Sequence, residues 1–157
     1  MKSLLINISL LLLVGMTMGS CKRDYNYFTA KVTPTVTRFI LMEGDELEIT
    51  KVEVSDAAIQ HGDDGPVEPV TEYTVDHIDY FIGNVKIGES SNKPYAFKYT
   101  IGDLPAGEHE LRVDALITDI PKRVWRDKDD SKYPNSSNPK GKHRARVSAT
   151  CTLYVIK

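Results

Sequence analysis

Short apolar runs that alternate with polar residues constrain the fold of this chain more than any other feature. The clearest run follows the turn residues 102–107 and covers residues 108–117. Successive side chains of a strand point to opposite faces. One face of this run is apolar apart from a histidine at its rim (His109, Leu111, Val113, Ala115, Ile117). The other face carries Glu108, Glu110, Arg112, Asp114 and Leu116. No segment has a convincing helical period of 3.6, so the sequence predicts an all-β fold.

The other β-rich runs predict the number of strands. The dipeptide Gly83-Asn84 predicts a tight hairpin, and a change of parity in the second run indicates a bulge near Lys51. Longer polar loops are expected over 56–71 and 118–143. With these turns we expect about seven strands in an immunoglobulin-like antiparallel β-sandwich over residues 35–157. The other runs are 35–42, 46–55, 74–82, 85–88, 95–101 and the segment from 144 onwards.

Residues 1–20 have the order of a secretory signal peptide. Lys2 precedes an apolar run over residues 4–14, and the small residues Gly19 and Ser20 follow. The run has eleven positions, whereas a permanent membrane span needs roughly twenty. A cleaved signal peptide is therefore expected.

Cys21 stands where this signal would be cut. Residues 18–21, Met-Gly-Ser-Cys, resemble the lipobox of bacterial lipoproteins, so we expect Cys21 to be acylated. The alternative is an ordinary secreted protein in which Cys21 pairs with Cys151. Because the pattern places Cys151 on the inward face of the last strand, acylation is the preferred interpretation. Residues 21–34 are interpreted as a tether between lipid and domain.

Charge is distributed unevenly along the chain. The formal net charge is only −2, which argues against a dedicated nucleic-acid binder. Twelve acidic residues lie between Glu43 and Asp79, and nine basic residues lie between Lys122 and Arg146. The basic run could attract anionic lipid or a polyanionic glycan. Pairing with the acidic region of the same molecule is favoured, because the sandwich topology brings the two loops to one pole.

Three segments between Val75 and Asp119 carry a family resemblance: HIDYFIGNVKIG at 77–88, PYAF at 94–97 and LPAGEHEL at 104–111. They resemble bacterial Ig-like domains of Bacteroidetes-type lipoproteins and of modules attached to surface glycan-processing proteins. Such domains include spacers, adhesion modules and glycan binders. The resemblance therefore implies the fold, and it transfers no binding residue to this chain.

The best binding candidate is Trp125, the only tryptophan, which falls in the loop over 118–143. An exposed aromatic ring flanked by Arg123 and Arg126 could serve a sugar ring or a protein partner, with Tyr133 and His61 beside it. The alternative is that Trp125 folds back as a lid on the core.

Asp127, Asp129 and Asp130 place carboxylates near one another, as a calcium site requires. Lys132 stands where an EF-hand has its turn glycine, and Asn138 where it has its glutamate. A solvated turn is therefore preferred, and no cofactor is expected.

Enzymatic signals are poor, because the four histidines are scattered and no common catalytic motif occurs. We therefore expect a non-enzymatic envelope lipoprotein, held by its lipid in the outer membrane and facing either the periplasm or the cell surface. Its domain would serve as a binding, adhesion or spacer module for a glycan or an envelope protein. The alternatives are a structural subunit of an envelope assembly and, less favoured, a small hydrolase.

Overall fold

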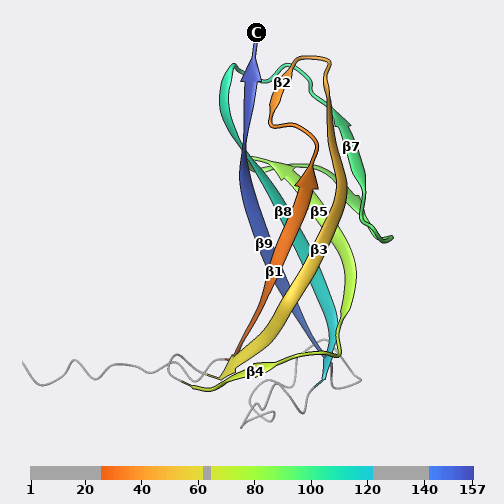
Figure 1. Ribbon diagram of the computed structural model, residues 1–157, viewed down its shortest axis with the longest axis vertical. Coiled ribbons are helices and arrows are strands. Elements are labelled where there is room, and N and C mark those ends of the chain that lie inside the picture. Colours follow the sequence, from red (N-terminus) through yellow and green to blue (C-terminus); the bar gives the residue numbers. More distant parts are fainter. Residues whose placement is uncertain (1–25, 62–64, 122–141) are drawn as a thin grey trace, which may run out of the picture.

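The computed structural model describes residues 26–61, 65–121 and 142–157, and this part of the chain is built from nine strands (Figure 1). Within it, no helix is long and apolar enough to cross a membrane. The strands are β1 (Asn26–Val36), β2 (Ile40–Met42), β3 (Glu46–His61), β4 (Val67–Pro69), β5 (Thr74–Ile82), β6 (Val85–Ser90), β7 (Phe97–Thr100), β8 (Gly107–Pro121) and β9 (Lys142–Ile156).

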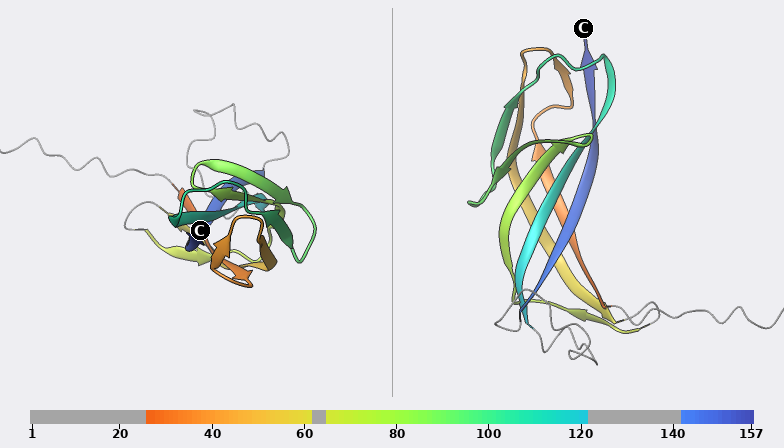
Figure 2. Two further views of the ribbon diagram at one scale, coloured as in Figure 1. Left: turned by 90° about the horizontal axis from the view of Figure 1, so that it is seen from above. Right: turned by 180° about the vertical axis from the view of Figure 1, so that it is seen from behind.

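Two sheets form a sandwich around an apolar core (Figure 2). One has the order β1-β3-β4, with β7 also paired to β3, and the other has the order β2-β9-β8-β5-β6. The alternating run of β8 supplies the centre of the core, with Leu111, Val113, Ala115 and Ile117 fully buried. The predicted all-β, immunoglobulin-like fold is confirmed.

The expected tether contributes to the sandwich. β1 begins at Asn26, and its residues pair with β3 in antiparallel register, for example Val32 with Val54. Val32 is buried, and Phe28 and Ala30 pack against the core from the same strand. The alternation of Phe28, Ala30 and Val32 with polar residues is present in the sequence, but it is short and lies between the expected acylation site and Pro34, where a tether was expected. The boundary between tether and domain therefore moves from residue 34 to residue 26.

A change of sheet accounts for part of the difference between nine strands and the expected seven. The predicted run over 35–42 is split, because β1 ends at Val36 in one sheet and β2 pairs in parallel with β9 in the other. Thr37 donates its N–H to the Glu48 carbonyl at 3.1 Å, and Leu41 is then fully buried in the second sheet. This crossing ties the two sheets together.

Bulges carry β3 and β8 beyond the point where their alternation is readable. The predicted bulge near Lys51 is confirmed, because Thr35 pairs with Lys51 and Val36 with Ile49. Further along β3, Asp56 has φ 52°, a left-handed conformation that aspartate tolerates. The strand then continues to His61, so the loop expected from residue 56 starts later.

The hairpin between β5 and β6 agrees with its prediction. Ile82 pairs with Val85 across Gly83-Asn84, and Gly83 has φ 56°. A turn of this kind requires positive φ, which glycine adopts without steric cost.

Tyr80 is the largest fully buried side chain of the described core. Its ring stacks on Phe97 with centroids 4.4 Å apart, and its hydroxyl donates a hydrogen bond to the Tyr95 carbonyl. Gly88 lies opposite Tyr80 on β6, and a Cβ there would come within 2.3 Å of the Phe97 ring. An aromatic pair over a glycine thus joins the two sheets across the core.

His109 stabilises the turn that leads into β8 through a hydrogen bond to its backbone. Its Nε2 donates a hydrogen bond to the Pro105 carbonyl at 2.8 Å, four residues earlier. Leu111, two residues further on, is fully buried. The tyrosine corner of Ig domains likewise bonds a side chain near the start of a strand to the backbone a few residues earlier.

Replacing His109 with alanine is expected to lower the free energy of unfolding by about 1 kcal/mol, because the Pro105 carbonyl loses its donor. Urea denaturation of the purified protein measures this change. Glu110→Ala, at an exposed position of the same strand, is the control and should stay within about 0.5 kcal/mol of wild type. Equal losses in both variants would contradict a role for this hydrogen bond.

Candidate functional site

Most of the residues predicted from the sequence lie outside the described part of the chain: Cys21, Arg123, Trp125, Arg126, Asp127, Asp129, Asp130 and Tyr133. The strands β8 and β9, which flank the segment that contains all of these residues except Cys21, are described. The ends of β3 and β8 lie at the same pole as the starts of β1 and β9, which we call the entry pole (Figure 1). The opposite pole, with β2 and the end of β9, is called the far pole. The topology thus agrees with loops that share a pole, and the binding and metal sites stay predictions.

His61 is the one predicted binding residue that the structure describes. It ends β3, its side chain is only 13 % exposed, and its Nε2 lies 3.8 Å from Glu68 Oε2 on β4. The imidazole is therefore held against β4. Among the described residues, no group of three or more acidic, histidine or cysteine side chains is arranged to hold a metal ion.

Cys151 is a free thiol on β9. It lies opposite Leu111 in the register and packs against the core, as the sequence pattern predicts. Burial raises the pKa of the Cys151 thiol above its ordinary value. Because the thiolate is the reactive form, this surrounding makes the thiol less reactive.

Two buried aspartates lie side by side on the outer face of the five-stranded sheet. Asp79 of β5 and Asp114 of β8 are direct partners in the register, and only 6 % and 4 % of their surfaces are exposed. Two carboxylates in this position repel each other and are costly to bury without cations.

Basic side chains from the neighbouring strands surround these carboxylates. Lys86 Nζ lies 2.8 Å from Asp79 Oδ1, and hydrogen bonds to Asp79 and Glu89 raise the pKa of Lys86. Arg112 Nε lies 3.3 Å from Asp114 Oδ1. Arg146 bridges the two carboxylates: its Nη2 lies 3.8 Å from Asp79 Oδ2, and its Nη1 lies 3.8 Å from Asp114 Oδ2. We call these five residues the ion cluster (Asp79, Lys86, Arg112, Asp114, Arg146).

Two further contacts complete the ion cluster. His77 Nε2 lies 3.5 Å from Asp79 Oδ1, and the Arg112 guanidinium lies over the Phe81 ring at 4.2 Å. The carboxylates are thus compensated from within the molecule. This arrangement favours a structural role over an acid–base or metal-binding one.

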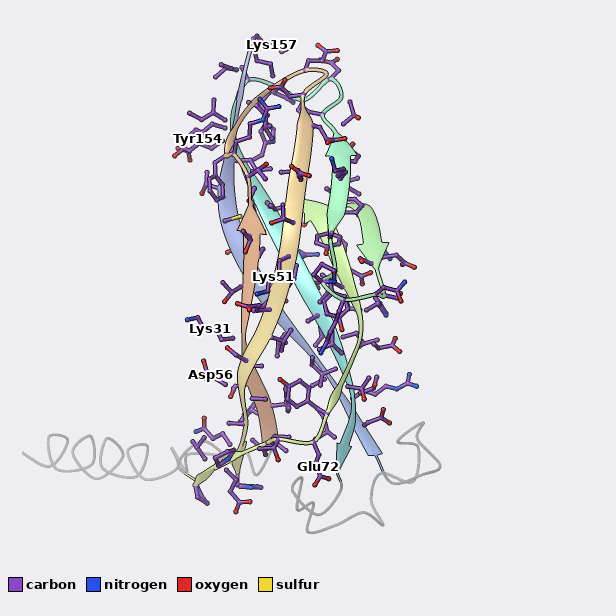
Figure 3. All side chains as sticks on the ribbon, turned by 45° about the vertical axis from the view of Figure 1, so that its right-hand side comes forward. Lys31, Lys51, Asp56, Glu72, Tyr154 and Lys157 are labelled. Carbon is purple, nitrogen blue, oxygen red and sulfur yellow. The ribbon has the colours of Figure 1, made fainter. Side chains whose placement is uncertain are left out.

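An exposed apolar surface lies at the other end of the same sheet face. Parallel pairing places Ile40 beside Tyr154 and Met42 beside Ile156. These four side chains are 43–59 % exposed, while the alternate residues Leu41, Leu153 and Val155 are buried. We call the four residues the apolar block. It lies near the far pole, where Tyr154 points away from the sandwich (Figure 3).

Sequence patterns gave only weak signals for the ion cluster and the apolar block. Aspartate is uncommon within strands, so Asp79 and Asp114 in the middle of two β-rich runs were a signal. For the apolar block, Ile40 and Met42 flank Leu41, so the run looks like an ordinary buried strand. Only the pairing of β2 with β9 brings the four exposed side chains together.

Comparison with known proteins bears on the part of the chain that forms the middle of the sandwich. Residues 70–113 match the family described as bacterial Ig domain. This stretch contains β5, β6, β7 and the first part of β8, including Tyr80 and His109. No curated protein and no solved structure matches the chain. Together, the family match and the two-sheet topology support a bacterial Ig-like domain.

Proposed function

We propose that this chain is an envelope lipoprotein, anchored through acylated Cys21, whose Ig-like domain is a binding module that presents the apolar block to a protein partner. A bacterial Ig-like domain suggests a binding or spacer role, and this family is typically non-enzymatic. The exposed block on β2 and β9 carries the proposal of binding, because contiguous apolar surface is costly to leave in water.

The position of the block suits a molecule anchored at its N-terminus. β1 begins at Asn26, so four residues separate it from Cys21, and the connection spans at most about 15–18 Å. The entry pole would then lie close to the membrane surface. β9 has 15 residues and runs from the entry pole to the far pole, which corresponds to about 50 Å. The apolar block would therefore be held well above the lipid headgroups.

The chemistry of the block favours protein over glycan. Three of its four side chains are aliphatic or thioether groups, and Tyr154 contributes the one hydroxyl. A sugar-binding site combines aromatic rings with several polar groups that bond the ring hydroxyls. Glycan recognition through Trp125 is the alternative. In that case Trp125→Ala would abolish glycan retention, while substitutions in the block would leave it unchanged.

The anchor is tested by replacing Cys21 with serine. We expect the variant to leave the membrane fraction and to lose metabolic labelling with a fatty acid, because serine offers no thiol for acylation. Cys151→Ser is the matched control and should keep both properties, since Cys151 lies in β9 within the sandwich. Unchanged fractionation and labelling of Cys21→Ser would refute the anchor. For the wild-type protein, density-gradient separation of the inner and outer membranes would show which membrane holds it, and labelling of intact cells would show whether it faces the cell surface.

A further inference from the structure

We propose that the partner of the apolar block is a second copy of this chain, packed face to face about a two-fold axis that runs parallel to the strands. The contact itself follows from the surface of the folded domain. Its occurrence between neighbours in one membrane rests on the proposed function.

Exposed apolar side chains of the described residues are concentrated at this place. Five of the eight large hydrophobic residues that are exposed belong to the block or to Phe39 beside it, whereas Tyr27, Val67 and Val85 lie on other strands. The four half-exposed side chains of the block form a surface on the order of 400 Å², comparable with the largest apolar patch of a typical monomer. With a polar rim, such a surface approaches the roughly 800 Å² that each partner of a stable complex buries.

The orientation of the block suits a neighbour in the same membrane. Its side chains lie on the outer face of the five-stranded sheet, so they point sideways from the long axis of the sandwich. An axis parallel to the strands relates two such faces while it keeps both entry poles at the same end. Two anchored copies would thus meet at equal height, and confinement to one membrane raises their effective concentration.

Charges beside the block complement each other under this symmetry. On one side, β8 places Glu108 opposite Tyr154 and Glu110 opposite Thr152, and both glutamates are exposed. On the other side, Arg38 precedes β2; its guanidinium lies 3.4 Å from Asp45 Oδ1 of the same chain, and its side chain is still 52 % exposed. Rotation about the axis lays the β2 side of one copy over the β8 side of the other. Arg38 would then face the two glutamates of the second copy, which favours association.

The outer edge of β2 is less suited to recruit a partner by strand addition. Met42 donates its N–H to Asp45 Oδ2 at 2.9 Å, and the Met42 carbonyl accepts the Asp45 N–H at 3.0 Å. The turn after β2 thus occupies the backbone groups at this end of the strand. Association is therefore expected through side chains on the face of the sheet.

Cross-linking of the full-length protein in its own membranes tests the contact. Tyr154→Cys should give a disulfide-linked dimer on a non-reducing gel. Tyr154 lies on β9, between β2 and β8, and therefore close to the axis, where each residue approaches the same residue of the second copy. Wild type and Thr33→Cys, an exposed position on β1 of the other sheet, are the controls and should give no disulfide-linked dimer on this gel. Absence of a Tyr154→Cys dimer, or an equal yield from Thr33→Cys, would overturn the proposal.

Sedimentation of the Cys21→Ser protein gives a test that does not depend on the anchor. A concentration-dependent dimer is expected, and Ile156→Asp should weaken it by about tenfold or more, because an aspartate would be desolvated in the contact. Unchanged circular dichroism would show that this exposed substitution leaves the fold intact. Arg38→Glu should weaken the dimer, and Glu108→Arg with Glu110→Arg in the same chain should restore it.

Each result bears separately on the anchor and on the contact. A monomer at all concentrations would overturn self-association while leaving the acylation of Cys21 untouched. If Cys21→Ser stays in the membrane fraction but the protein still dimerises through the block, the contact stands and the anchor fails. Dimers that persist in Ile156→Asp and in Arg38→Glu would place the contact elsewhere and overturn the proposal.

Discussion

Replacing Tyr80 with alanine is expected to lower the free energy of unfolding by about 3–5 kcal/mol, a large part of the stability of a small domain. The side chain is fully buried, and its ring covers the Phe97 ring in parallel, at an interplanar angle of 4°. Alanine would remove this contact and leave a cavity between the two sheets. Chemical denaturation followed by far-ultraviolet circular dichroism measures the loss.

Two milder substitutions separate the contributions of Tyr80. Tyr80→Phe keeps the ring and removes only the donor to the Tyr95 carbonyl, so about 1–2 kcal/mol should be lost. Gly88→Ala forces a methyl group against Phe97 and should cost about 1–3 kcal/mol. Val85→Ala is the control, because that side chain is 67 % exposed. If Tyr80→Ala were no worse than Val85→Ala, the stacked pair would not hold the sheets together.

The same residue gives the protein an alkaline limit. Burial raises the pKa of Tyr80 above its ordinary value of 10.0, so the folded state keeps the phenol proton to a higher pH than the unfolded state does. The contribution of the Tyr80 proton to the free energy of unfolding is therefore fully present below pH 10 and is lost as the pH rises above that value. Tyr80→Phe should flatten this alkaline decline. A smaller decline should remain, because burial raises the pKa of Tyr95 in the same direction.

The strands were predictable wherever one face is apolar and the other polar. β8 shows this best, because Leu111, Val113, Ala115 and Ile117 are fully buried in the core while the residues between them lie on the other face. β1 was missed over residues 26–34 although Phe28, Ala30 and Val32 alternate with polar residues, because the segment lies beside the expected acylation site and was interpreted as a tether. The crossing from β1 to β2 could not be read from local pattern either, because it depends on pairing with β3 and β9.

Surfaces made by distant strands were beyond local pattern as well. Ile40 and Tyr154 lie more than a hundred residues apart in the chain, and only the parallel register of β2 and β9 makes them neighbours. The same holds for Asp79 and Asp114, which were visible as polar residues in two strands but not as a pair. Sequence reasoning instead favoured the loop around Trp125, because it contains the only tryptophan of the chain and several basic residues. Exposure and pairing, which decide what a surface can bind, follow from the tertiary fold.

Replacing Arg112 with alanine is expected to be the most damaging substitution in the ion cluster, at about 2–4 kcal/mol. The variant loses the ion pair to Asp114 and the contact with the Phe81 ring. Asp114 would remain almost completely buried, with the more distant Arg146 as its cation at 3.8 Å. A buried carboxylate that loses its cation is strongly destabilising. Thermal unfolding at neutral pH measures this loss.

The opposite change should be milder, because the two sides of the ion cluster are not equally buried. In Asp114→Asn the partners Arg112 and Arg146 keep 30 % and 53 % of their side chains exposed, so water can solvate their charge. We expect about 1–2 kcal/mol, with the double variant losing less than the sum of the two single ones. If Asp114→Asn cost more than Arg112→Ala, or if the two effects were additive, the arginine would not stabilise the fold by compensating this carboxylate.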